Sequence, residues 1–447
     1  ADLLKLGREL RWHPPHMRSR YETWIEGLNS DWLVSRQRYF GVPFPVWYRV
    51  EADGQTSYDD PILPAEDDLP VDPSSDVPSG YSPDQRGRPG GFVEDPDVMD
   101  TWATSSLTPQ IVTGWVDDTD LFERTFPMNL RPQGPEIIRT WLFNTVVRAR
   151  FEHGGLPWSD TTINGWVLDP DRKKMSKSKG NVVTPMPLVD EYGPDALRYW
   201  ACNGRPAVDT AVDFGIMKIG RKLAIKILNA SKFTLNIAGE HRSSTNDLAP
   251  VANPLDRSML ATLADLVAEA TTAFDAFDYA RALERTERFF WSFCDDYVEL
   301  VKGRAYGGIG AAPAASAAVA LRAALSTLLR MFAPIMPFVT EEVWSWFESG
   351  SVHRAVWPSG APLRLADADP LVFQVVAEVL AAVRKAKSEQ KRSLRTPVDR
   401  VVVHDTPERL AALARAESDL CDAGKIVALT TEIGPELRVE VELAPPE

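Results

Sequence analysis

The chain has 447 residues, 44% of them hydrophobic, and a formal net charge of −14 at pH 7. This length exceeds what one hydrophobic core organises, so two or three globular domains are expected. Its three cysteines, Cys202, Cys294 and Cys421, form no Cys-x-x-Cys pair, which argues against zinc and disulfides and favours a reduced cytoplasmic compartment. No apolar run reaches membrane-spanning length, and residues 1–16 do not resemble a signal peptide. The sequence starts in what reads as mid-domain sequence, so we expect a piece of a longer polypeptide.

Helical and extended patterns alternate in the first half of the sequence. Residues 18–28 have helical apolar spacing, and the prolines within 41–48 predict extended chain. Residues 51–90, rich in Pro, Asp, Ser and Gly, predict a long, acidic surface insertion. The next predicted elements are a helix over 137–149, a strand over 161–168 and a helix over 187–200. This alternation of strands and helices predicts a parallel α/β sheet.

Long patterns rich in alanine and leucine replace this alternation after Gly215. They lie near 216–236, 255–303, 312–349 and 371–392. Together they predict a helix bundle. The tail from Val401 to Val441 has β-branched runs around one helix, which predicts a small α/β appendage.

The segment Lys174-Met175-Ser176-Lys177-Ser178-Lys179-Gly180-Asn181 places three lysines within six residues. A lysine-rich loop is usually a solvated surface or a nucleic-acid patch. Here the strand-like run from Gly165 to Leu168 leads into the loop. Flexible ammonium groups beside two hydroxyls suit a site where negative charge develops on phosphate oxygens. The segment therefore predicts phosphate chemistry.

Two clusters of basic residues stand out against the negative net charge, and nucleic-acid binding depends on such local patches. Every charged residue of 216–236 is basic: Lys218, Arg221, Lys222, Lys226 and Lys232. The second cluster, opposed only by Glu389, consists of Arg384, Lys385, Lys387, Lys391, Arg392 and Arg395. For the second cluster a solvated helix face is an equally good interpretation.

Further motifs accompany the lysine loop. They are Trp24-Ile25, Ser35-Arg36-Gln37-Arg38, Gly41-Val42-Pro43, the segments 100–106 and 131–141, and, in the helical half, 290–295 and 333–344. In this order they resemble the class I aminoacyl-tRNA synthetases for aliphatic amino acids, and among these the valyl-tRNA synthetases. Residues 174–178 match the KMSKS signature of class I without a mismatch. The resemblance covers most of the chain from Tyr21 to Trp344.

The resemblance implies a Rossmann-type catalytic domain split by a large editing domain and followed by an α-helical anticodon-binding domain. This chain resembles the part after the split. The implied parts are a junction from the editing insertion over 1–30, the second catalytic half over 31–214, the anticodon-binding domain over 215–395 and the α/β appendage over 396–447. The HIGH signature belongs to the missing half. His13-Pro14-Pro15-His16 has its histidine spacing, but it carries prolines where the family opens a helix and is expected to follow no strand, so it is rejected.

The implied reaction joins valine to tRNA(Val) through valyl-adenylate, with ATP and Mg²⁺ as a substrate complex and with neither a tightly bound cofactor nor zinc. The implied catalytic residues are Lys174, Ser176, Lys177 and Ser178, and the implied ATP-binding residues are Gly134, Glu136, Trp166, Val167, Met175 and Lys177. Trp102, Ile137 and Trp141 would wall the valine pocket. The implied tRNA-binding residues are Lys218, Arg221, Lys222, Lys226, Arg384, Lys385, Lys387, Lys391 and Arg392.

Two of these assignments carry a reservation. Asp100, the fourth implied residue of the amino-acid pocket, would orient the substrate ammonium or the adenylate, or it would cap a helix. Pro135 departs from the family pattern and removes a backbone donor from the nucleotide loop.

Several alternatives stay open at this point. The isoleucyl, leucyl and methionyl enzymes are the nearest alternatives to the valine enzyme. A non-catalytic tRNA-binding remnant is a hypothesis of another class, which the intact lysine loop argues against. A natural half-protein with a separate partner is a third. Because the editing domain lies outside the chain, the chain is expected not to hydrolyse threonyl-tRNA.

Overall fold

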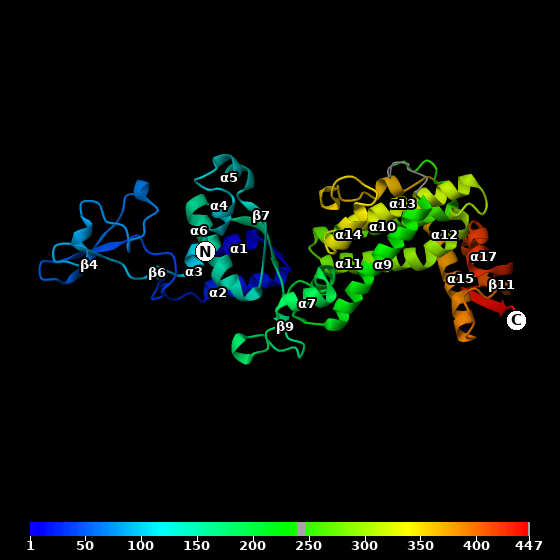
Figure 1. Ribbon diagram of the computed structural model, residues 1–447, viewed down its shortest axis with the longest axis horizontal. Helices are drawn as coiled ribbons and strands as arrows, with labels where there is room; N and C mark the ends of the chain where they lie inside the picture. The colour runs from blue at the N-terminus through cyan, green and yellow to red at the C-terminus, as the bar shows by residue number, and fades with distance from the viewer. Residues whose placement is uncertain (239–246, 446–447) are drawn as a thin grey trace. The chain divides into compact units, whose positions relative to one another are not determined.

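The computed structural model describes residues 1–238 and 247–445. Its contacts divide the chain into two compact units, residues 1–166 and residues 167–447, and the ribbon of each is drawn in Figure 1. Each unit has its own core and is described by itself.

Unit 1 contains a parallel sheet of order β1-β8-β7. Its strands are β1 (Arg11–His13), β7 (Met128–Gln133) and β8 (Trp158–Ile163). Both outer strands run parallel to β8, with Thr161 paired to Trp12 on one side and to Arg131 on the other. The parallel sheet predicted from the alternating pattern is thereby confirmed.

One face of this sheet is buried. Thr161 and Ile163 of β8 are fully buried, and Trp12 of β1 packs its ring 5.7 Å from that of Tyr21, which lies 6.5 Å from Phe143. The helices of unit 1 are α1 (Asp2–Glu9), α2 (Arg18–Glu26), α3 (Thr101–Ser105), α4 (Thr108–Val112), α5 (Thr119–Thr125) and α6 (Phe143–His153), with a π-helical turn at Ile138–Leu142 before α6. The predicted helices at 18–28 and 137–149 are present.

The acidic insertion has a sheet and a core of its own. Strands β3 (Trp47–Val50), β4 (Thr56–Ile62) and β5 (Phe92–Glu94) form an antiparallel sheet of order β4-β3-β5. Trp47 and Phe92 are buried in it. Arg86 donates to the carbonyl of Pro73 and to the Glu94 carboxylate, both at 2.8 Å. The sequence pattern missed strand β4. The short pair β2 (Ser35–Arg36) and β6 (Val98–Met99) links the insertion to α3.

Unit 2 begins with the lysine loop and two short helices. Strand β9 (Val167–Leu168) pairs in parallel with β10 (Thr210–Ala211), and α7 (Pro185–Tyr192) and α8 (Pro194–Asn203) lie between them in the chain. Two predictions need correction here. The strand predicted over 161–168 is interrupted between Ile163 and Val167. The helix predicted over 187–200 breaks at Gly193, whose φ of +88° is left-handed and favours glycine.

A helix bundle forms the body of unit 2, and α9, α10, α11 and α13 run through it in Figure 1. Its helices are α9 (Phe214–Ala238), α10 (Pro254–Asp275), α11 (Tyr279–Ser292), α12 (Val298–Ala305), α13 (Ala311–Phe332), α14 (Pro337–Trp344) and α15 (Pro370–Glu389), with a π-helical turn at Phe293–Tyr297. The four predicted helical regions are confirmed, although the second and third each contain more than one helix. Helix α13 is long and apolar enough to span a membrane, but 78% of its apolar window is buried among the other helices.

The appendage consists of the sheet β12-β11-β13 and two helices. Its elements are β11 (Val398–Asp405), α16 (Pro407–Ala414), α17 (Glu417–Gly424), β12 (Ile426–Ile433) and β13 (Arg438–Leu443). The α/β character is as predicted, but the prediction of one helix is wrong. Ala416, at φ −134° and ψ 22°, separates α16 from α17.

Candidate functional site

The lysine loop is held in shape by Asp169 and Asn181 at its two ends. Nδ2 of Asn181 donates to Oδ2 of Asp169 at 2.7 Å, and Oδ1 of Asn181 accepts from the backbone N–H of Ser176 at 3.0 Å. The other oxygen of Asp169 accepts from the N–H of Lys173 at 2.7 Å. These backbone and side-chain donors lower the pKa of Asp169. These bonds give the loop a defined shape.

This scaffold leaves the predicted catalytic side chains accessible. Lys174, Lys177 and Ser178 are exposed, while Met175 and Ser176 are half-buried. The hydroxyls of Ser176 and Ser178 lie 3.3 Å apart, and Sδ of Met175 accepts from the N–H of Val183. In the described part of the chain, Lys177 makes no ion pair. An exposed ammonium group without a carboxylate partner attracts an anion.

In unit 1, the predicted nucleotide residues Gly134, Glu136 and Trp166 lie together beyond the carboxyl end of β7. Oε2 of Glu136 accepts a hydrogen bond from Nε1 of Trp166 at 2.9 Å. A side chain at position 134 would meet this carboxylate, because a Cβ there would lie 2.5 Å from Oε2 of Glu136. Gly134 thus allows the carboxylate to fold back over the loop. Val167, the remaining nucleotide candidate, is exposed in β9 of unit 2.

Trp102 lies in α3 and Trp141 in the π-helical turn, two elements that pack together, and Ile137 ends the 3₁₀ turn Pro135–Ile137 just before the π-helical turn. Nε1 of Trp141 donates to the carbonyl of Ser105 at 2.9 Å, which fixes the indole against α3. Trp102, Ile137 and Trp141 are all half-buried. The π-helical turn begins directly after Ile137, and such turns recur at functional sites because they shift the direction of the following side chains.

Asp100 is the N-cap of α3. Its Oδ1 accepts from the N–H of Trp102 at 2.8 Å, and its Oδ2 lies 2.7 Å from Nη2 of Arg36. The capping role that the sequence left open is observed. The ion pair with Arg36 joins the Ser-Arg-Gln-Arg segment to the start of α3.

Arg131, which the sequence did not single out, clamps the indole of Trp141. Its guanidinium carbon lies 3.0 Å from the centroid of the Trp141 ring and 4.9 Å from that of Trp158. Only 7% of Arg131 is exposed, and its Nε and Nη2 have no hydrogen-bond partner among the described residues. Burial lowers the pKa of Arg131 to about 10. Gln133, two residues along the same strand, likewise has both amide atoms buried and unbonded within the described ranges.

The histidines of His13-Pro14-Pro15-His16 follow a strand, contrary to the prediction. His13 is the last residue of β1, a strand too short for its pattern to be recognised. Its Nε2 lies 2.9 Å from Oδ1 of Asp160, which also accepts from Arg11. His16 is exposed in a short 3₁₀ turn. His13 thus takes part in a polar cluster on the sheet.

The basic residues of α9 divide into exposed and paired side chains. Lys218 and Lys222 are exposed. Nζ of Lys226 lies 2.8 Å from Oδ1 of Asp295, and Arg221 donates to the carbonyl of Glu191. Among the aromatic residues of the motifs at 290–295 and 333–344 and next to them, Phe293, Tyr297 and Trp344 are buried in the bundle, and Trp291 is half-buried.

The second basic cluster is not a uniform solvated face. Lys385 is exposed and lies 3.8 Å from Glu389, and Lys391 is exposed as well. Arg384 donates to the carbonyl of Asp295, and Arg392 donates to the carbonyl of Ala444 at 3.3 Å. Lys387 is buried.

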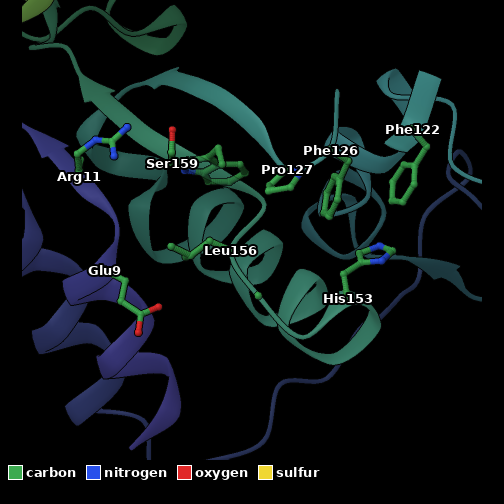
Figure 2. Close-up of a pocket in the computed structure, with 10 residues that line it drawn as sticks. Glu9, Arg11, Phe122, Phe126, Pro127, His153, Leu156 and Ser159 are labelled. Carbon is green, nitrogen blue, oxygen red and sulfur yellow. The ribbon is translucent and has the colours of Figure 1, made fainter. Parts of the chain in front are cut away.

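A cavity of about 460 Å³ lies at the amino ends of β1 and β8, as Figure 2 shows. The rings of Phe122 and Phe126 lie next to His153 at one end, and Glu9 and Arg11 lie at the other. None of the predicted site residues lines it. Ligands of parallel α/β sheets bind beyond the carboxyl ends of the strands, so this cavity is not the expected catalytic pocket.

Two family descriptions match the chain. Residues 1–213 match "tRNA synthetases class I (I, L, M and V)", and residues 256–403 match "Anticodon-binding domain of tRNA ligase". The chain belongs to the class I tRNA synthetases. The resemblance recognised in the sequence, and the fold it implied, are confirmed.

Similar curated proteins are valine–tRNA ligases. The chain is 62% identical to that of Thermobifida fusca over 449 residues, which cover 100% of this chain and 50% of the relative. It is 55% identical to that of Salinispora tropica, covering 99% of this chain and 53% of the relative. The chain therefore spans about half the length of the curated relatives it matches.

Solved structures of other synthetases share the fold. The Agrobacterium radiobacter K84 agnB2 LeuRS, in a ternary complex with tRNA and LeuAMS, aligns with a TM-score of 0.60 at 19% identity, covering 91% of this chain and 51% of that one. The Mycobacterium tuberculosis methionyl-tRNA synthetase, bound by methionyl-adenylate, aligns with a TM-score of 0.54 at 20% identity, covering 76% and 60%.

Proposed function

We propose that the chain is the carboxy-terminal portion of a valine–tRNA ligase, carrying the lysine half of the active site and the anticodon-binding domain. One observation carries the proposal: an ordered loop from Lys174 to Asn181 presents its ammonium groups to solvent on a chain that is 62% identical to a valine–tRNA ligase. The proposed domain bounds are 31–214 for the catalytic half and 215–395 for the anticodon-binding domain. The proposed location is the cytoplasm.

In the proposed reaction, the valine carboxylate attacks the α-phosphate of ATP, which is bound as its Mg²⁺ complex, and pyrophosphate leaves. Negative charge grows on the departing oxygens, where Lys174 and Lys177 would neutralise it and Ser176 and Ser178 would donate hydrogen bonds. No covalent intermediate with the protein is needed, because positioning and electrostatics supply the catalysis. The Asp169–Asn181 contact supports this role, since it fixes the shape of the loop that carries these side chains.

Nucleotide recognition is proposed for Gly134, Glu136 and Trp166 of unit 1 and for Val167 and Met175 of unit 2. The Glu136 carboxylate would accept from the ribose hydroxyls while its Oε2 keeps the bond from Trp166. Pro135 offers no N–H, so the loop would contact the nucleotide mainly through the groups on either side of it.

Selection of valine is proposed for Trp102, Ile137 and Trp141. Two indoles and a β-branched side chain form a small, stiff wall that would exclude isoleucine by overlap. Threonine is nearly isosteric with valine, and valine enzymes are themselves the standard example of the resulting limit, a rejection of threonine by only about 10²-fold. Editing is therefore needed, and it is proposed to lie in the half of the relatives that this chain does not span.

Contacts to tRNA(Val) are proposed for Lys218, Arg221, Lys222 and Lys226 on α9, and for Arg384, Lys385, Lys387, Lys391 and Arg392 on and after α15. The exposure of Lys218 and Lys222 supports a direct phosphate contact. Lys226 is ion-paired with Asp295, so it would have to release this carboxylate to contact a phosphate directly. Otherwise it would attract the tRNA only through its positive charge, without a direct contact.

The testing experiment is amino-acid-dependent ATP–pyrophosphate exchange with valine, isoleucine, leucine and methionine. It is run on the chain alone and after addition of the amino-terminal half of a relative. Exchange that appears only with valine and only on complementation is expected. Exchange with another amino acid would reassign the substrate. Silence with both halves present, together with intact tRNA binding, would favour the non-catalytic remnant.

A further inference from the structure

A second cavity, of about 450 Å³, lies where the helix bundle meets the appendage in unit 2. Helices α12, α15 and α17 and the segment after α15 all contribute to it. Five cationic side chains line it against two carboxylates, those of Glu299 and Asp422. The cations are Lys302, Arg384, Lys387, Arg395 and Lys425. On a chain with a net charge of −14, this is a local excess of positive charge.

Lys387 forms the buried floor of this cavity. It is only 1% exposed, and its Nζ donates to the carbonyls of Leu394 at 3.0 Å and Gly424 at 2.8 Å. An ammonium group has three N–H donors, so one remains after these two bonds. A buried charge without a counter-ion is costly, and the described residues place no carboxylate within ion-pair distance of Lys387.

The electrostatic surroundings of Lys387 agree with this description. Burial lowers its pKa, and the positive charges of Lys425 and Arg384 lower it further. An anion in the cavity would reverse this effect, because it would favour the charged form of the lysine.

The rim cations are held loosely, by contacts that an anion could replace. Lys302 lies 3.5 Å from Glu299, and Lys425 lies 3.2 Å from Asp422, with all four side chains about half exposed. Exposed pairs of this kind contribute about 0–1 kcal/mol, so breaking them costs little. Arg395 is exposed beside them.

We propose that this cavity binds a phosphate group, and that the group is a backbone phosphate of tRNA. The phosphate would accept from the third N–H of Lys387 and from Lys302, Arg395 and Lys425 at the rim. The tRNA source rests on the proposed function. The site is separate from the exposed lysines of α9, so it would give the RNA a second point of attachment near the appendage.

Site-specific lysine acetylation of the full chain tests the site directly. Lys302 and Lys425 line the cavity, while Lys5 of α1 is also exposed, does not line it and has no proposed contact to tRNA. Acetylation is quantified by peptide mass spectrometry without ligand, with inorganic phosphate alone, and with tRNA. We expect tRNA to lower acetylation of Lys302 and Lys425 severalfold relative to Lys5. Protection by phosphate alone but not by tRNA would keep the anion site and overturn its RNA source. Protection by neither would overturn the proposal.

Charge reversal supplies an independent test. Lys302→Glu and Arg395→Glu should each weaken tRNA binding roughly tenfold, the cost of one charge-assisted hydrogen bond, and each should reduce the salt dependence by about one counterion. Lys5→Glu changes the charge equally at an exposed lysine that lies outside the cavity and has no proposed contact to tRNA, so it is the matched control. Equal effects of all three variants would overturn the proposal, because they would then reflect only the long-range attraction between positive charge and tRNA.

The two hypotheses can fail separately. Binding of tRNA needs neither valine nor the missing half. If complemented exchange is absent while Lys302→Glu and Arg395→Glu weaken tRNA binding, the proposed activity fails and the phosphate site stands. If valine-dependent exchange is present while these variants match Lys5→Glu, the phosphate site fails alone.

Discussion

Arg304 of the helix bundle and Asp419 of the appendage form an ion pair that solvent does not reach. Nε of Arg304 lies 3.0 Å from Oδ1 of Asp419, and the side chains are 1% and 5% exposed. The same guanidinium lies 2.8 Å from the Asp256 carboxylate, which also accepts from Tyr297 and Ser316. One buried cation therefore joins α10, α12 and α17, and it depends on both carboxylates to offset its desolvation.

Removing one partner of this pair should destabilise unit 2. Asp419→Ala leaves Arg304 buried with less compensation, and the expected loss in free energy of unfolding is about 3–5 kcal/mol. Urea denaturation followed by circular dichroism measures it. Asp422→Ala, in the exposed pair with Lys425 on the same helix, is the control and should change stability by less than about 1 kcal/mol. Similar losses for both variants would contradict a special role for the buried pair.

Lys177→Ala should reduce the rate of valine activation by roughly 10²–10³-fold in the complemented enzyme, the range found when one group that stabilises developing charge is removed. Valine binding should change little, because the charge develops only in the transition state. Lys173→Ala is the matched control, since Lys173 lies in the same loop but its Nζ faces Asp171 at 3.5 Å. Pre-steady-state adenylation separates rate from binding. Equal losses in both quantities would exclude the assigned role.

Arg131→Met should loosen the valine pocket. The guanidinium stacks on the Trp141 indole, and a desolvated contact of this kind is worth about 2 kcal/mol. Without it the indole can shift, so discrimination of valine over isoleucine should fall by up to roughly tenfold in the ratio of kcat/KM. Arg139→Met, at an exposed position in the π-helical turn, is the control. Unchanged discrimination in Arg131→Met would show that the Ser105 contact alone fixes Trp141.

Acid should remove a contribution of Asp160 to stability. The hydrogen bond from Arg11, with further bonds from His13 and Ser159, holds the pKa of Asp160 well below its usual range. A depressed carboxyl pKa stabilises the fold fully above the unfolded value of about 3.9, and this stabilisation is lost as pH falls from there through the folded pKa. The stability advantage of the native chain over Asp160→Asn should therefore shrink as pH drops below about 4. A pH series of urea midpoints measures it, and a constant difference would contradict the assignment.

Thiol reactivity should separate Cys421 from Cys294. Burial raises the pKa of Cys294 to about 12, so almost none of it is thiolate at about pH 8. Cys421 is only half-buried. Alkylation with iodoacetamide followed by peptide mapping should label Cys421 well before Cys294. Urea should abolish the difference, and early labelling of Cys294 would indicate that the bundle opens locally.

The features that could be predicted from the sequence depend on long or strictly ordered patterns. The helices of the bundle repeat apolar residues over many turns, and the lysine loop is recognised from the order of its residues alone. Strand β1 was not predicted, because its three residues are too few to show an alternating pattern. Strand β4 escaped because its sequence, TSYDDPI, is polar, and pairing with β3 rather than its own pattern makes it a strand.

Side-chain partners were harder to predict than elements. Lys387 belongs to a run of basic residues, and such a run predicts a solvated side chain. In the structure, α15 packs against the appendage and buries Lys387, whose Nζ donates to two carbonyls. Arg131 reads as an ordinary strand residue, because nothing local shows that two tryptophans further along the chain flank it. Asn181 is the exception, because its place in the sequence marks it: it ends the lysine motif directly after a glycine. The φ of that glycine, Gly180, is +66°, a value that favours glycine, so the Gly-Asn pair indicates the turn that closes the loop.

The Arg304 contacts also affect when unit 2 can finish folding during synthesis of the chain. Asp419 is made 115 residues after Arg304. Until Asp419 leaves the ribosome, the arginine has the Asp256 carboxylate and the Pro313 carbonyl as acceptors, but only one of its two carboxylate partners. We therefore expect the nascent bundle to complete its packing around Arg304 only after the appendage has been made. A chain truncated before α17 should remain a target for chaperones and proteases even though most of its helices are present.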